Sequence, residues 1–299
     1  MTLAFAACAT LLAAGQLKDA DPQRLDIGES GVVTVSPGQI VETSDHKVRT
    51  ADQLAKAAAN YDYFYIGEQH ATTAHQQMEA DMLHALANER RRVVVGFEML
   101  TRPKQDALDA WSLGSLSEAQ FLDQSDWGRQ WGFDYAFYRP VFEAVKELHA
   151  PAVALNVPRD WVHAVSRTGF AGLPTSAKIQ LPVQLYLGNR EHRKVFDALM
   201  GGHEMQGVTM DNLYEAQVLW DEGMADTALK YIERSPNDPS NIFVVIAGAG
   251  HVLYKQGINF RVERRHGGRG LTLVMIESDT PVTVSRSIAD YVFVSPKGH

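Results

Sequence analysis

Two motifs with the order Gly-x-x-His lie far apart in this 299-residue sequence, at 67–70 (Gly-Glu-Gln-His) and 248–251 (Gly-Ala-Gly-His). A further carboxylate, Glu98, follows Gly-Phe, and Asn156 stands before Val-Pro. Carboxylate and imidazole groups without a thiolate suit a divalent transition metal such as zinc, manganese or iron, and do not suit copper(I). These residue types predict one pocket for metal binding or catalysis, formed by Glu68, His70, Glu98, Asn156 and His251.

Each of these residues also has an ordinary structural interpretation. A single glutamate after a strand, such as Glu98, often caps a helix or joins an ion pair. His70 could cap a helix that begins near Ala71, and the turn at 248–250 could bind no ligand. That turn is not a dinucleotide-binding fingerprint, because no third glycine follows at the required offset. The recurrence of one spacing at two distant places favours a shared site over coincidence.

The motifs follow short apolar runs that have the length of β-strands. The middle runs are apolar without alternation, as expected for strands buried on both faces of a parallel sheet. Ligands of open α/β folds bind at the edge formed by the carboxyl ends of such strands. The motifs are therefore predicted to converge on that edge, after runs at 61–66, 93–97, 152–155 and 242–247, with a fifth run at 271–276.

Helical patterns separate these runs. The strand–helix alternation predicts an α/β fold with a mainly parallel β-sheet flanked by helices and joined by right-handed crossovers. A short helix with an N-cap at Thr50 is expected over 51–60, and Pro37-Gly38 predicts a hairpin within 31–43. The longer helices are expected at 71–89, 102–111 and 135–149.

The segment from about residue 160 to 234 is too long for one crossover helix. We expect it to form a smaller helical subdomain inserted into the sheet domain. The predicted division is an export or lipoprotein signal at 1–15, a sheet domain formed by 25–159 together with 236–299, and a helical subdomain at 160–235.

Composition excludes several classes of protein. The formal charge is −8, from 28 basic and 36 acidic side chains, which argues against a nucleic-acid partner. The short basic runs at 90–92 and 261–269 are expected to flank strands at the solvent edge. A single cysteine rules out an intramolecular disulfide and any metal cluster held by several cysteines.

That cysteine, Cys8, lies within an uncharged apolar run at 3–15. The run is too short to span a bilayer and resembles the apolar core of an export signal. Phe5-Ala-Ala before Cys8 resembles a lipoprotein cleavage box, although leucine is usual where Phe5 stands. Acylation of Cys8 would anchor the chain to membrane lipid. The alternative is an N-terminal helix that carries a chance cysteine.

Taken together, the motifs resemble those of the ChaN-type haem-binding lipoproteins in the haem-binding uptake/Tiki superfamily. The resemblance covers about 61–260 and rests on Tyr-Ile-Gly-Glu-Gln-His at 65–70, Gly-Phe-Glu-Met at 96–99, Asn-Val-Pro at 156–158, Gln217, Asp221, Met224-Ala225, Gly-Ala-Gly-His at 248–251 and Gly257. It implies a parallel-sheet domain, a smaller helical bundle and a lipid anchor facing the periplasm at the outer membrane of a Gram-negative bacterium. It further implies haem bound by tyrosine at the interface of a homodimer, in iron acquisition with other haem-uptake components.

No motif identifies the haem tyrosine by position, so candidates come from chemistry. Haem needs an apolar slot, an axial tyrosine or histidine, and cations near its propionates. The candidate ligands are Tyr186, Tyr138, His192 and His203, with Arg190 and Arg193 as propionate partners. Each could instead belong to an ordinary amphipathic helix.

Two functions of different classes stay open. The first is haem binding for iron uptake, without turnover; a weaker variant is a scaffold that passes haem to another component. The second is an exported metal-dependent hydrolase, in which His70 and His251 hold a metal and Glu68 or Glu98 acts as general base. A serine hydrolase is disfavoured because no Gly-x-Ser-x-Gly elbow occurs.

Overall fold

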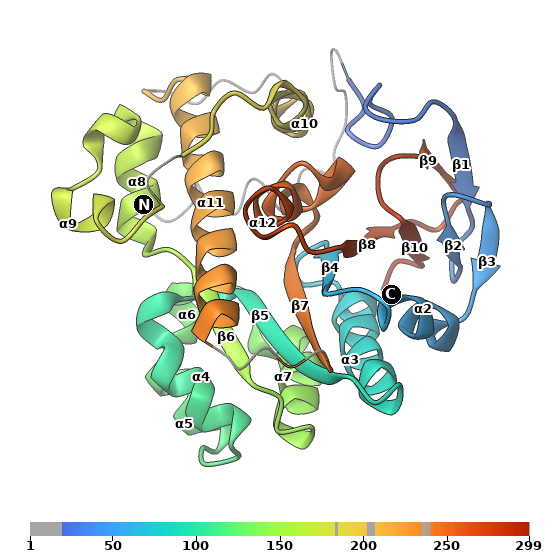
Figure 1. Ribbon diagram of the computed structural model, residues 1–299, viewed down its shortest axis with the longest axis horizontal. Helices are drawn as coiled ribbons and strands as arrows, with labels where there is room; N and C mark the ends of the chain where they lie inside the picture. The colour runs from blue at the N-terminus through green and yellow to red at the C-terminus, as the bar shows by residue number, and fades with distance from the viewer. Residues whose placement is uncertain (1–19, 183–184, 202–206, 235–237, 239, 299) are drawn as a thin grey trace.

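A computed structural model describes residues 20–182, 185–201, 207–234, 238 and 240–298. Its central sheet has eight strands in the order β3-β2-β10-β8-β4-β7-β5-β6 (Figure 1). All pairs from β10 to β6 are parallel, and β2 is antiparallel to both of its neighbours. The mainly parallel sheet is therefore confirmed. Its strands are β2 (Ile40–Glu42), β3 (Lys47–Arg49), β4 (Tyr63–Glu68), β5 (Arg92–Thr101), β6 (Ala152–Asn156), β7 (Asn241–Gly248), β8 (Gly270–Glu277) and β10 (Tyr291–Ser295).

Helices cover both faces of this sheet (Figure 1). One face is covered by α2 (Ala51–Ala58), α3 (Thr73–Asn88), α4 (Gln105–Ser112), α5 (Glu118–Ser125), α6 (Trp127–Gln130) and α7 (Tyr135–Glu147). The other face carries α10 (Arg190–Met200), α11 (Met210–Arg234), α12 (Ile258–His266) and the short 3-10 turns η3 (Ala249–His251) and η4 (Leu253–Lys255). The chain is thus an α/β sandwich of three layers.

Side-chain alternation along the central strands explains the two cores. In β4, Phe64 and Ile66 pack toward α3, whereas Tyr63 and Tyr65 pack into the core beside α11 and α12. Successive residues of a strand point to opposite faces. Because both faces are covered, every residue of β4 is buried. This accounts for apolar runs that do not alternate with polar residues.

The local signals at 50–60 are also confirmed. The Thr50 hydroxyl accepts from the Gln53 N–H at 3.2 Å, and the Gln53 side chain accepts from the Thr50 N–H at 3.0 Å. This reciprocal capping box satisfies two otherwise unpaired donors at the start of α2. Helices also occupy the segments predicted at 71–89, 102–111 and 135–149, the second of them beginning with the 3-10 turn η1 (Arg102–Lys104).

The predicted hairpin is wrong. Gly38 does turn the chain, with φ +81°, but β1 (Val32–Val35) and β2 belong to different sheets. β1 pairs antiparallel with β9 (Val282–Ser285), whereas β2 pairs with β3 and β10. Val33 and Val35 are buried in the same core as β10, so a long-range apolar contact determines the partner of β1.

The segment 160–235 contains several helices that pack in two ways. Met224, Ala225 and Ala228 of α11 belong to the core of the sheet. On the outer side of α11, Ala216 and Leu219 contact residues of α8 (Arg159–Thr168) and α9 (Thr175–Lys178), with η2 (Phe170–Gly172) between them. The division into two domains stays a prediction. No helix in the described ranges has both the length and the apolarity needed to cross a membrane.

Candidate functional site

The carboxyl ends of β4, β5 and β7 bring the predicted residues together. Glu68 lies opposite Gly248 in the β4–β7 ladder, and the Gly248 N–H donates to Glu98 Oε2 at 2.6 Å. A Cβ at position 248 would lie 2.8 Å from Cε1 of His70 and 3.6 Å from Glu98 Oε2. Glycine is therefore needed here so that His70 can lie against the backbone of β7. The motifs do converge on one edge of the sheet.

Glu68 orients His70. Glu68 Oε1 lies 2.6 Å from Nδ1 of His70 and accepts from the Tyr138 hydroxyl at 3.3 Å, while the Gln76 amide donates to the other oxygen. Burial alone would lower the pKa of His70, but the hydrogen bond and charge of Glu68 outweigh it and raise that pKa. The imidazole also meets the ring of Trp131 edge-on, with centroids 4.5 Å apart. His70 is held as an ion-pair partner of Glu68.

His251 lies between two carboxylates. Its Nδ1 is 2.6 Å from Asp221 Oδ1, and its Nε2 is 3.3 Å from Glu98 Oε1. These charges overcome burial and raise the pKa of His251 well above its ordinary value. In turn, His251 overcomes the effect of burial on Glu98 and lowers the pKa of that carboxyl to about 2. The group is a charged imidazolium held by two carboxylates.

Asp221 of α11 extends this network and was not among the predicted site residues. Its Oδ2 lies 2.8 Å from Nε2 of His192 and 3.6 Å from Nη1 of Arg261, and its pKa is lowered mainly by Arg261 and His251 against the effect of burial. Gln217, one turn earlier, contacts His251 Nδ1 at 3.0 Å. The sequence signal that could have identified Asp221 is its spacing of four residues from Gln217, which places two polar side chains on a mostly apolar helix face.

The cluster does not support the metal-dependent alternative. Both ring nitrogens of His251 are paired with carboxylate oxygens in this structure, at 2.6 Å and 3.3 Å. Within the described ranges, no three His, Cys, Asp or Glu side chains are grouped as a metal site. The Asn156 amide donates to the backbone oxygen of Glu98 at 3.0 Å, and its oxygen accepts from the Val157 N–H. Asn156 therefore joins β5 to β6.

Two of the predicted haem ligands lie inside the protein. Tyr138 is fully buried, and its hydroxyl accepts from the Ala71 N–H at 3.1 Å while donating to Glu68. Burial raises the pKa of Tyr138, which opposes formation of tyrosinate. His192 is 1% exposed, with Nδ1 at 3.2 Å from the Tyr214 hydroxyl and Nε2 paired with Asp221. Neither side chain is accessible to a ligand at the surface in this structure, and the assignment of Tyr138 and His192 as haem ligands stays a prediction. His203 and Cys8 lie outside the described residues.

Tyr186 is the candidate that lies at the surface. It is 39% exposed and stacks on Phe260, with ring centroids 6.1 Å apart and an angle of 23° between the ring planes. The guanidinium of Arg264 lies 5.0 Å from the centre of the Tyr186 ring. A Cβ at Gly188 would lie 3.0 Å from that ring, so glycine leaves the space that the ring occupies. Tyr186, Phe260 and Arg264 form what we call the Tyr186 surface.

The predicted propionate partners differ from Arg264 in their surroundings. Arg193 forms ion pairs with Asp197 and Asp211, each at 2.8 Å. Arg190 is exposed at the first turn of α10. The basic run 261–269 is predicted to lie at the solvent edge, and Arg264 is not among the predicted site residues. For Arg261 the prediction is wrong, because its side chain is fully buried against Asp221 and Glu222.

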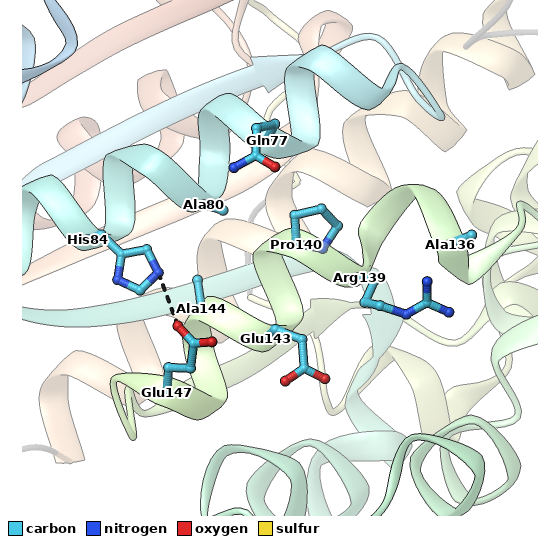
Figure 2. Close-up of a pocket in the computed structure, with 9 residues that line it drawn as sticks. All are labelled: Gln77, Ala80, His84, Ala136, Arg139, Pro140, Glu143, Ala144 and Glu147. Carbon is cyan, nitrogen blue, oxygen red and sulfur yellow. Dashed lines mark ion pairs between the residues drawn. The ribbon is translucent and has the colours of Figure 1, made fainter.

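A groove of about 400 Å³ lies elsewhere, between α3 and α7 (Figure 2). Small side chains, Ala80, Ala136 and Ala144, form part of its wall. His84 and Glu147 face each other across it at 3.5 Å. None of the predicted site residues in the described ranges lines this groove. The groove is separate from the Tyr186 surface and from what we call the strand-end cluster, formed by Glu68, His70, Glu98, Asn156, Asp221 and His251.

The fold is similar to that of a solved structure of ChaN from Campylobacter jejuni, a protein described as binding haem cofacially. The similarity has a TM-score of 0.66 at 17% identity and covers 85% of this chain and 95% of that one. More distant similarities are to a mutant of the erythromycin esterase EreC (TM-score 0.46, 9% identity, 83% and 77% covered) and a MARTX toxin effector domain from Vibrio vulnificus (TM-score 0.46, 14% identity, 84% and 41% covered). Among curated proteins, none matches this sequence.

The sequence itself establishes the family. Residues 54–262 match the family described as haem-binding uptake, Tiki superfamily, ChaN. That match includes β4 to β7 with the whole strand-end cluster, and it also includes Tyr186. This chain belongs to the ChaN family of the haem-binding uptake, Tiki superfamily.

Proposed function

We propose that this protein binds haem and contributes to haem uptake as a periplasm-facing lipoprotein, anchored in the outer membrane by acylated Cys8. Membership of a haem-binding uptake family supports haem as the ligand. The ChaN protein of Campylobacter jejuni, which shares the fold, is described as binding haem cofacially. Haem is the cargo in this proposal, and the chain performs no turnover.

The Tyr186 surface is the proposed haem site. This assignment rests on one observation. Among the candidate ligands in the described ranges, Tyr186 alone presents its ring at the surface. Tyrosinate is an established haem-iron ligand. Leu187, which is 41% exposed, and Phe260 supply apolar contacts, and Arg264 supplies a cation. These residues fit the needs of a planar, apolar ligand with acidic groups.

Further parts of the proposal concern partners. We propose that a second copy of the chain covers the bound haem, because Tyr186 and Leu187 leave apolar area exposed to water. The neighbouring helices α8 to α10 would contact the uptake component that receives haem. Neither step requires catalysis by the strand-end cluster.

Titration of the purified protein with hemin tests the haem site. We expect a saturable Soret band that is unaffected by chelators and is shifted and weakened in Tyr186→Phe. Tyr138→Phe is the matched control, because Tyr138 is buried and bonded to Glu68. A flat visible spectrum, together with stoichiometric zinc or manganese by elemental analysis, would contradict the proposal.

Lipid attachment requires its own experiment. We expect the full chain to incorporate radiolabelled palmitate and to fractionate with the outer membrane in a Gram-negative host. Cys8→Ser should abolish labelling and release the protein from the membrane. Labelling that persists in Cys8→Ser would contradict attachment at this residue.

A further inference from the structure

Glu222 of α11 is a fully buried carboxylate that is shared among three arginines. Its oxygens lie 3.4 Å from Arg261 Nε and 3.5 Å from Arg264 Nη2, and they also contact Arg265. The same carboxylate accepts from the backbone N–H of Tyr186 at 3.2 Å. Glu222 therefore ties the position of Tyr186 to that of the arginine cluster.

The neighbouring carboxylates of α11 do not offset this positive charge. Asp221 is already paired with His251 and Arg261, and lies beside His192. Asp226 contacts Arg102, Lys230 and Arg265. Asp226 is thus itself shared by three basic groups. Five arginine and lysine side chains contact these three carboxylates, namely Arg102, Lys230, Arg261, Arg264 and Arg265, so positive charge is in excess and favours an added anion.

Arg264 is the arginine of this cluster that faces outward. Its side chain is 33% exposed, compared with 20% for Arg265 and 1% for Arg261. Its guanidinium lies over two aromatic rings, 5.0 Å from the Tyr186 centroid and 5.9 Å from that of Phe260. Its only carboxylate partner in the described ranges is Glu222, which also serves two other arginines. Arg264 is thus oriented by aromatic stacking and incompletely neutralised.

We infer that Arg264 binds a propionate carboxylate of the porphyrin, so that the Tyr186 surface selects porphyrins with free acid groups. This inference rests on the proposed function and deepens it. A guanidinium forms two parallel hydrogen bonds with a carboxylate, and this geometry is lost when the acid is esterified. Arg264 therefore replaces Arg190 and Arg193 as the specificity-determining cation.

The contact does not depend on iron. Tyr186 would interact with the metal, whereas Arg264 would interact with the acidic edge of the macrocycle. Metal-free protoporphyrin IX should therefore keep its dependence on Arg264 and lose its dependence on the Tyr186 hydroxyl. The two residues can be separated by the choice of ligand.

The test measures Kd for hemin, hemin dimethyl ester and protoporphyrin IX by absorbance and by quenching of tryptophan fluorescence. We expect Arg264→Gln to raise the Kd for hemin and for protoporphyrin IX about tenfold, which is the effect of losing one charge-assisted contact. The Kd for the dimethyl ester should change by less than about twofold in Arg264→Gln. Arg264→Lys should restore part of the affinity for the free acids.

Arg269→Gln is the matched control. Arg269 also stacks on a tyrosine, 5.3 Å from the Tyr61 ring centroid, but it bonds the Asn60 carbonyl and lies outside the Glu222 cluster. Arg269→Gln should leave all three affinities unchanged. Thermal unfolding of each variant confirms that the fold persists.

The outcomes distinguish the propionate contact of Arg264 from haem binding itself. If Arg264→Gln weakens the binding of hemin and of its dimethyl ester equally, or changes the binding of neither, the proposed contact with propionate is wrong. In that case a Soret band that depends on Tyr186 still supports haem binding. If the wild-type protein produces no Soret band with hemin, the proposed function fails and this inference fails with it.

Discussion

The strand-end cluster and the Tyr186 surface use adjacent carboxylates of the same helix, and they differ in how those charges are balanced. At the strand ends, His251 lies between Asp221 and Glu98, and both of its nitrogens are paired. At the surface, Glu222 is shared by three arginines. Asp221 belongs to a balanced buried network, whereas Glu222, the next residue of α11, leaves positive charge near solvent.

This difference separates stability from binding. A buried ion network in which every charge has a partner stabilises one arrangement, and removing a member leaves an uncompensated charge. An exposed guanidinium whose carboxylate partner is shared with other cations can bind a ligand anion at little desolvation cost. We therefore expect substitutions at the strand ends to change folding, and substitutions at the Tyr186 surface to change affinity.

The largest expected effect is that of Asp221→Asn. Loss of this carboxylate leaves His251 and Arg261 buried without their shared partner. Breaking such a network costs about 3–5 kcal/mol of the free energy of unfolding. Urea denaturation followed by circular dichroism measures this loss.

A surface carboxylate is the control for that experiment. Asp197, whose side chain is 50% exposed, pairs with Arg193, and Asp197→Asn should cost less than about 1 kcal/mol. Equal losses in the two variants would mean that the strand-end network does not stabilise the fold.

The next effect is that of Gly248→Ala. The added Cβ would lie 2.8 Å from Cε1 of His70, whose ring is held by Glu68 and cannot move freely. Overpacking of this kind costs about 1–3 kcal/mol. Gly128→Ala is the control, because no other part of the described chain lies within 4 Å of a Cβ at position 128, apart from its chain neighbours and the backbone of its own helix. If Gly248→Ala unfolds like the wild type, the strand ends are not closely packed around His70.

Much of this comparison could be predicted from local sequence. Strands such as β7 are buried on both faces, which leaves an apolar run that can be recognised without other information. The convergence of His70, Glu98 and His251 follows from parallel strands, because their carboxyl ends share one edge. The glycines beside these residues mark close approach of a side chain to the backbone.

What could not be predicted depends on distant partners. Arg261 is fully buried because Asp221 and Glu222 of α11 neutralise it, and no local pattern in 261–269 indicates those partners. For the same reason, the turn at Gly38 was predicted but the pairing of β1 with β9 was not. The accessibility of Tyr186 and the burial of Tyr138 likewise depend on tertiary packing.

An effect that depends on pH is expected for Glu79→Gln. Glu79 is fully buried near Glu68, and burial together with that carboxylate raises the pKa of Glu79 well above its ordinary value. The protonated acid therefore stabilises the fold below pH 4.5, and this contribution is lost as pH rises, because the unfolded chain releases the proton. The loss is at most about 1.4 kcal/mol per pH unit.

Glutamine stays neutral, so the stability of Glu79→Gln relative to wild type should increase between pH 5 and pH 8. Chemical denaturation at several pH values measures that difference. Glu89→Gln, at an exposed position after α3, should show no such trend. A pH-independent difference for Glu79→Gln would show that this carboxyl is ionised in the folded protein.

The smallest expected effect is that of Arg193→Gln, which separates a neutralised surface arginine from Arg264. Arg193 has two carboxylate partners of its own, Asp197 and Asp211, and lies 5.0 Å from the Tyr214 ring centroid. Because its charge is already balanced, we expect its loss to change the Kd for hemin by less than about twofold and the free energy of unfolding by less than about 1 kcal/mol. Hemin titration and urea denaturation measure the two quantities. A tenfold loss of hemin affinity in Arg193→Gln would mean that charge balance does not decide which arginine binds the ligand.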